Sequence, residues 1–252
     1  MDNNNDERNK TQIIRIDAKN CFVESKSDAF EIGKVHLEFM TYDTSKPEGQ
    51  RKTNNVHIYI DIPDFLCLAQ EALSGMLHAR ARQQRVFNES KIDKDKDRTP
   101  LYQSLGGTSA ARLKHINQSR PDGMSISRTV QLILGKKDDF YLFIADSGPG
   151  ETDSKGLIVP KFGNNPENHV AVSMGWRALN EIMMMTRVHY EAWLASKYVS
   201  EIGSAKPQTN YQAKSIQSVQ PQQNQSHVPP PQNNGAYGSI GAAVNGEDLK
   251  MF

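Results

Sequence analysis

The chain has 252 residues, with 30 Lys and Arg against 29 Asp and Glu, so its net charge at neutral pH is only +1. This balance excludes a uniformly basic nucleic-acid binder, and no apolar run reaches the roughly 18 residues that a membrane-spanning helix needs. The polar start of the chain lacks the apolar segment of a secretion signal, which predicts a cytoplasmic protein with no membrane partner.

We expect two related halves between a polar start and a polar tail. Residues 1–10 are predicted to be disordered, and residues 11–200 to form a folded body. This body comprises repeat one (11–88), a basic linker of alternating charge (89–98) and repeat two (99–200).

Repeat one is predicted as strands that lead into a helix. Residues 12–16 and 34–42 have strand patterns, and an alternating stretch from Val56 runs into a helix over about 63–85. Asp61 is placed to accept hydrogen bonds from the free amides of the first turn. The buried stripe of this helix is predicted to comprise Phe65, Ala69, Ala72, Leu73, Met76 and Leu77.

Repeat two has the same layout 112 residues later, where His169 aligns with His57 and Ser173 with the cap residue Asp61. A helix is predicted over about 176–199, with Leu179, Ile182, Met183, Thr186, Tyr190, Trp193 and Leu194 on one face. The preceding strands are predicted at 99–105, 125–134, 140–145 and 157–162, with turns at 135–139 and 147–150. These patterns define an α+β fold of two antiparallel β-meanders, each followed by a long helix.

With this layout, residues 10–200 resemble the Whirly and PUR families of single-strand binders, which repeat a four-stranded sheet followed by a helix. The resemblance implies that the helices pack on one side. It also implies that the sheets offer curved, partly aromatic surfaces to unstacked bases.

Positive charge is concentrated in one part of the body. Thirteen cations and five acids lie between Ala79 and Lys137, which predicts a surface that faces a polyanion. Residues 106–109 are expected to form a mobile loop whose amides approach phosphates. The cations predicted to contact phosphates are Arg112, Lys114, Arg120, Arg128, Lys136, Lys137 and Lys161.

Aromatic side chains are the candidates for base stacking. Alternation along 140–143 places Tyr141 and Phe143 on one face of a strand and Phe140 on the other. We expect Tyr141 to face solvent, because its hydroxyl tolerates water. Further stacking candidates, each with ordinary packing as the alternative, are Tyr59, Tyr102, Tyr42 and Phe162.

The C-terminal region has the composition of a tether with a functional tip. Residues 201–246 are rich in Gln, Pro and Asn, which predicts a disordered linker. The acidic and aromatic tip, 247–252, makes the region similar to the tail of bacterial single-stranded-DNA-binding proteins (SSB). This similarity implies that the tip recruits replication or recombination proteins, with an ordinary frayed terminus as the alternative. The implied partner-binding residues are Glu247, Asp248, Leu249, Met251 and Phe252.

No catalytic or metal-binding pattern stands out. The seven histidines form neither a His-x-His nor a His-Glu-x-x-His motif, and no Gly-x-Ser-x-Gly motif occurs. Cys21 and Cys67 fit no metal spacing and are expected to be reduced thiols. We therefore expect a protein that is not an enzyme and has no metal or cofactor.

The sequence predicts a single-stranded DNA-binding protein that forms a homo-oligomer and coats DNA without strong sequence preference. It would recruit its protein partners through the tip, and it would suit a plasmid, phage or conjugative element. Two alternatives stay open. One is a strand-annealing or RNA-binding protein, and the other is a non-nucleic-acid adaptor of a mobile element.

Overall fold

The computed structural model describes residues 10–204 of the chain. This part is α+β, with two antiparallel sheets and a C-terminal helix, which confirms the fold class at that level. Sheet A has the strand order β1-β2-β3-β4, and sheet B has the order β5-β6-β7-β8, with β9 also paired to β7. The strands are β1 (Gln12–Ala18), β2 (Cys21–Lys26), β3 (Lys34–Tyr42), β4 (Lys52–Asp61), β5 (Tyr102–Thr108), β6 (Ser125–Leu134), β7 (Phe140–Thr152), β8 (Ile158–Pro160) and β9 (Asn168–Gly175). The helices are α2 (Ile62–Leu73), α3 (Met76–Glu89), α4 (Ala110–His115) and α5 (Trp176–Ser204), with short 3-10 turns η1 (Phe30–Ile32) and η2 (Asp93–Asp95).

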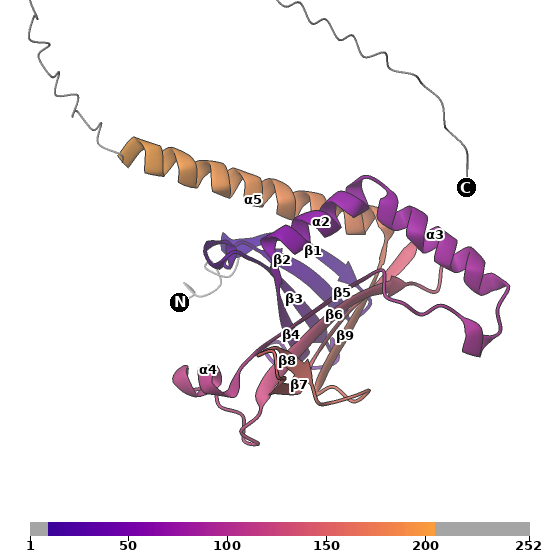
Figure 1. Ribbon diagram of the computed structural model, residues 1–252, viewed down its shortest axis with the longest axis horizontal. Helices are drawn as coiled ribbons and strands as arrows, with labels where there is room; N and C mark the ends of the chain where they lie inside the picture. The colour runs from indigo at the N-terminus through magenta and orange to yellow at the C-terminus, as the bar shows by residue number, and fades with distance from the viewer. Residues whose placement is uncertain (1–9, 205–252) are drawn as a thin grey trace, which may run out of the picture. The chain divides into compact units, whose positions relative to one another are not determined.

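The two sheets share one hydrophobic core. Phe39 of sheet A meets Phe143 of sheet B edge to face, with ring centroids 5.0 Å apart. Helix α5 contacts strands of both sheets and buries Leu179, Ile182 and Met183. Figure 1 shows α2, α3 and α5 on one side of the sheets and α4 at the far end. Since the buried residues of both sheets belong to one cluster, the two sheets form one structural unit.

The first predicted helix, 63–85, is two helices. Gly75 separates α2 from α3, and its φ of +81° is a left-handed conformation that favours glycine. The break changes the direction of the chain, so Leu73 and Met76 are exposed beside it and their predicted burial is wrong. The remaining four residues of the predicted stripe are buried.

The second long helix, α5, begins at the predicted residue, Trp176, and ends later than predicted. The Trp176 amide donates a 2.8 Å hydrogen bond to the Asp139 carbonyl oxygen, which ties the start of α5 to the β6–β7 hairpin. Ser173 is therefore a residue of β9, paired with Leu142, and its predicted role as a helix cap is wrong. The helix ends at Ser204, so it includes the first residues of the predicted linker.

Most predicted strands are confirmed, and the main exceptions involve glycine. Residues 106–109 and 147–150, predicted as a loop and a turn, lie mainly in β5 and β7. A side chain at Gly107 would place its Cβ 2.4 Å from the Ile126 carbonyl oxygen and 2.6 Å from the Ile158 side chain. Glycine is needed in β5 because β6 and β8 both approach it closely, and not because the chain turns there. Strand β2 was not predicted at all.

Replacing Gly107 with alanine should destabilise the fold by about 1–3 kcal/mol, because the new methyl group must displace β8 or distort β5. The measurement is the urea midpoint of unfolding. Gly106→Ala is the matched control, since an added Cβ at this neighbouring position meets nothing within 4 Å. Equal effects of the two substitutions would contradict the close approach of β6 and β8 to Gly107.

Candidate nucleic-acid interface

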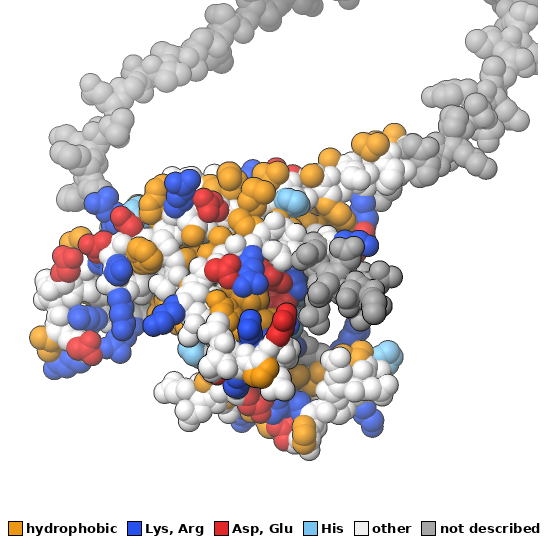
Figure 2. Space-filling model, turned by 180° about the vertical axis from the view of Figure 1, so that it is seen from behind, with side chains coloured by type: hydrophobic (Ala, Val, Ile, Leu, Met, Phe, Trp, Pro, Cys, Tyr) orange, Lys and Arg blue, Asp and Glu red, His pale blue; other side chains and the backbone are white. Residues whose placement is uncertain are grey.

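The predicted phosphate-contacting cations are divided between two ends of sheet B. Arg112 and Lys114 are exposed on α4, whereas Lys136 and Lys137 lie in the β6–β7 hairpin at the other end of β6. That hairpin is held next to α3, because Arg85 donates a 3.0 Å hydrogen bond to the Lys137 carbonyl oxygen. Figure 2 shows Lys and Arg side chains scattered among acidic ones on the face it presents. The expected single surface of these cations is therefore not formed.

Two further predicted cations are already neutralised by carboxylates. Arg120 pairs with Glu167 at 2.6 Å and with Asp122 at 2.7 Å, and their hydrogen bonds raise the pKa of the guanidinium. Lys161 pairs with Glu151 at 2.8 Å. A phosphate would have to displace a carboxylate at either position.

Tyr141, the favoured stacking residue, is buried. Its side chain is 2% exposed, and its hydroxyl lies 2.9 Å from Nδ1 of His78. Tyr141 and Phe143 do share one face of β7, as predicted, but that face is the core. The expectation that Tyr141 faces solvent is wrong, because a protein partner satisfies its hydroxyl in place of water. Phe140 is the aromatic residue of this strand that is exposed.

Tyr102 on β5 is another of the predicted stacking residues, and burial raises the pKa of its hydroxyl to about 12.

Tyr59 and Arg128, by contrast, line the same cavity. Strands β4 and β5 are edge strands of sheets A and B, and a cavity of about 300 Å³ lies between them. Tyr59 on β4 is 44% exposed and points away from the core, and Arg128 reaches the cavity from β6. Lys34, paired with Asp61 at 2.6 Å, and residues 104–108 complete the wall. We refer to this cavity as the edge cleft.

Arg128 has no acidic partner among residues 10–204. Its Nη1 donates a 2.9 Å hydrogen bond to Thr108 Oγ1, and burial lowers the pKa of the guanidinium. A guanidinium carries five N–H donors, and burying its charge without a counter-ion is unfavourable. An anion in the edge cleft would supply both the missing charge and the missing acceptors.

The ring of Tyr59 rests on the imidazole of His36. Their centroids are 4.6 Å apart, and their planes are inclined by only 17°. This stacking holds a partly exposed flat ring in the cavity that Arg128 also lines, and a flat ring with a cation is a combination that can contact a base and a phosphate.

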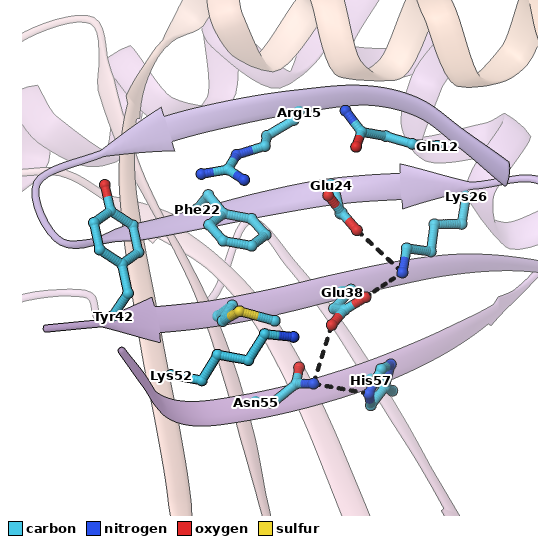
Figure 3. Close-up of a pocket in the computed structure, with 11 residues that line it drawn as sticks. Gln12, Arg15, Phe22, Glu24, Lys26, Glu38, Tyr42, Lys52, Asn55 and His57 are labelled. Atoms are coloured by element: carbon cyan, nitrogen blue, oxygen red, sulfur yellow. Dashed lines mark hydrogen bonds and ion pairs between the residues drawn. The ribbon is translucent and has the colours of Figure 1, made fainter. Parts of the chain in front are cut away.

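A larger cavity of about 710 Å³ lies on the outer face of sheet A, opposite to the core. Successive residues of a strand point to opposite faces, so each strand of sheet A contributes side chains to both the core and this cavity. Figure 3 shows the lining residues, which come from all four strands. We refer to the cavity as the sheet A groove; its lining includes Arg15, Phe22, Lys26, Tyr42 and Asn55.

One part of the sheet A groove combines flat and positive side chains. The guanidinium carbon of Arg15 lies 3.6 Å from the centroid of the Phe22 ring, and Arg15 also pairs with Asp17 at 2.6 Å. The ring of Tyr42 lies 6.3 Å from that of Phe22, and Lys52 is exposed. These are side chains that can stack with bases and neutralise phosphates.

The floor of the groove is charged and nearly buried. Glu24 is 8% exposed and Glu38 is 5% exposed. The Lys26 ammonium lies between them, 3.1 Å from Glu24 and in a direct ion pair with Glu38. Burial opposes the charged form of Glu38, but the Lys26 hydrogen bond and charge outweigh it and lower the pKa of this carboxyl. Because one ammonium faces two carboxylates, hydrogen-bond acceptors are in excess at the floor.

A chain of hydrogen bonds continues from Glu38 along the outer face. Asn55 Nδ2 donates to Glu38 at 3.0 Å and lies 3.1 Å from His57 Nε2, so that ring nitrogen is the acceptor. His57 then carries its proton on Nδ1 and donates to His36 Nε2 at 2.9 Å. His36 in turn donates from Nδ1 to Asp28 at 2.8 Å. Neutral imidazoles satisfy every link, and an additional proton on either ring would break one.

This arrangement makes stability depend on pH. Burial lowers the pKa of His57, against the opposing charge of Glu38. In the unfolded chain histidine titrates at about 6.5, so His57 contributes stability that is complete above that pH and is lost as the pH falls through its lower folded pKa. We therefore expect the free energy of urea unfolding to decrease between about pH 7.5 and pH 5.5. His57→Gln should reduce this slope, and an unchanged slope in that variant would contradict the assignment.

Comparisons of the chain with protein-family models, curated proteins and solved structures gave no match. Within residues 10–204, no helix is long and apolar enough to cross a membrane. Residues 1–9, the predicted linker beyond Ser204 and the predicted tip at 247–252 lie outside the described residues.

Proposed function

We propose that this protein binds single-stranded DNA through the edge cleft and the adjoining outer face of sheet A. The observation that carries the proposal is the combination of Arg128, which has no acidic partner in residues 10–204, with the exposed ring of Tyr59. The guanidinium would pair with a phosphate while the ring stacks with a base. These two contacts are the ones that sequence-tolerant strand binding uses.

The sheet A groove would extend this surface. Tyr59 stacks on His36, and His36 is hydrogen-bonded to His57, which lines the groove. A DNA strand that leaves the edge cleft would therefore pass over His36 and His57 and reach Arg15 and Tyr42. The sheet A groove lies on the outer face of sheet A, and the edge cleft opens between β4 and β5, so together they offer an extended surface that suits a long, flexible ligand.

The order of the elements supports the resemblance to the Whirly and PUR families, because each sheet leads into a helix. In this proposal the protein is not an enzyme, acts as a homo-oligomer and coats single-stranded DNA. The tip at 247–252 would recruit replication or recombination proteins, as the similarity to SSB tails implies.

The test is a fluorescence-anisotropy titration of labelled oligo-dT at two salt concentrations. We expect saturable binding whose log affinity falls with log salt by about 0.7 for each phosphate contact. Duplex DNA and oligo-rU of equal length are the controls, and both should bind more weakly. Tighter binding to oligo-rU would favour the RNA-binding alternative. Absence of salt-sensitive binding to any of these ligands would overturn the proposal.

A further inference from the structure

The sheet A groove separates positive charge from hydrogen-bond acceptors. Its cations Arg15 and Lys52 are the accessible ones, whereas the carboxylates of Glu24 and Glu38 are nearly buried at the floor. Lys26 neutralises one of the two carboxylate charges. A phosphate at the floor would therefore face excess negative charge, whereas Lys52 offers it opposite charge directly and Arg15 does so in competition with Asp17.

The floor also has acceptors that lack donors. Oδ1 of Asn55 is buried without a hydrogen-bond partner among the described residues, while its Nδ2 is fully used by Glu38 and His57. Glu24 contacts Lys26 through Oε1, and residues 10–204 provide no hydrogen bond to its second oxygen. An unsatisfied buried acceptor such as Asn55 Oδ1 is unfavourable, so a ligand that brings an N–H donor to it would gain, and the second oxygen of Glu24 is a further acceptor for such a donor.

The separation of charge and the acceptors without donors determine how a nucleic-acid strand could lie in the groove. Its phosphates would stay near Arg15 and Lys52, and its bases would point to the floor. The exocyclic amino groups of cytosine, adenine and guanine are donors. Thymine and uracil carry a carbonyl oxygen at the position where cytosine has its amino group, and this oxygen would face the carboxylate of Glu24.

We infer that the sheet A groove is a base-reading pocket that favours bases with an exocyclic amino group over thymine and uracil. The inference rests on the proposed strand binding and adds a modest base preference to it. Glu24 and Asn55 are the residues that determine this preference.

Oligo-dC and oligo-dU of equal length provide the sharpest comparison, because their bases differ only by the amino group or carbonyl oxygen and the adjacent ring proton. At slightly alkaline pH, where cytosine is uncharged, we expect about three- to tenfold tighter binding of oligo-dC, the effect of one or two hydrogen bonds. Glu24→Gln should bring the ratio of the two affinities close to one, because the variant can present an amide donor where the carboxylate only accepts. Lys26 keeps Glu38 as its partner in this variant, and the urea midpoint shows whether the fold is retained.

Glu191→Gln is the matched control, since it removes the same charge from the exposed side of α5 and should leave the ratio unchanged. Equal affinities of the natural protein for oligo-dC and oligo-dU would overturn the base-reading role and leave strand binding intact. A ratio that persists in folded Glu24→Gln protein would also overturn it. Absence of binding to both oligonucleotides would overturn the proposed function together with this inference.

Discussion

Replacing Arg128 with glutamine should weaken the binding of oligo-dT by about ten- to a hundredfold, the effect of losing a charge-assisted contact with phosphate. The slope of log affinity against log salt should decrease by about 0.7, because one fewer phosphate is neutralised. The fold should tolerate the change, since the guanidinium is half-buried without an acidic partner in residues 10–204 and its desolvation is unfavourable. Anisotropy titrations at several salt concentrations measure both effects.

The matched control removes charge from the other end of β6. Lys136 and Lys137 are exposed in the β6–β7 hairpin, and the double change Lys136→Ala with Lys137→Ala removes two positive charges. The affinity for oligo-dT should change little if the edge cleft holds the DNA. If this double variant weakens binding as much as Arg128→Gln does, net charge and not the edge cleft determines affinity.

The largest effect on stability is expected from Lys26→Met. This change leaves the carboxylates of Glu24 and Glu38 nearly buried without their ammonium partner, which should reduce the free energy of unfolding by about 3–5 kcal/mol near neutral pH. The loss should diminish in acid, because protonated carboxyl groups no longer need a counter-ion. Urea unfolding of the natural protein and the variant, at neutral and at acidic pH, measures the difference.

A triple variant shows whether charge is the cause. Lys26→Met combined with Glu24→Gln and Glu38→Gln contains no charge at these three positions, and most of the lost stability should return. If the triple variant is as unstable as Lys26→Met alone, the packing of the lysine stem and not its ammonium is what stabilises the sheet.

The sequence was sufficient to predict the elements whose signals are local. Strand β6 has the predicted bounds, and both sheet-to-helix junctions occur near their predicted positions. The glycines of β5 and β7 were interpreted as a loop and a turn, because a glycine required by tertiary packing looks the same in the sequence as one required by a loop or a turn. At Gly107 the reasons are the Ile126 carbonyl oxygen and the Ile158 side chain, which lie farther along the chain and approach it only after β6 and β8 have packed against β5.

The candidate site depends still more on tertiary structure. Tyr59 and Arg128 were each predicted, but their common cavity exists only because the edges of the two sheets meet. The sheet A groove was missed together with β2. The sequence of β3 contained a usable signal, because buried Leu37 and Phe39 alternate with the polar residues His36 and Glu38. His36 and Glu38 are both hydrogen-bonded to other side chains, which polar residues on a fully solvated face would not need. For Tyr141, no local pattern indicated that His78 would satisfy its hydroxyl.

The hydrogen-bond chain on sheet A also determines how its strands can align. It connects β2 through Lys26, β3 through Glu38 and His36, and β4 through Asn55 and His57. A slip of one residue between neighbouring strands would turn the charged side chains into the hydrophobic interior and the valines and leucines outward. The groups that prepare a surface for a ligand therefore also disfavour misaligned pairing, so substitutions there should impair correct assembly of the sheet as well as recognition.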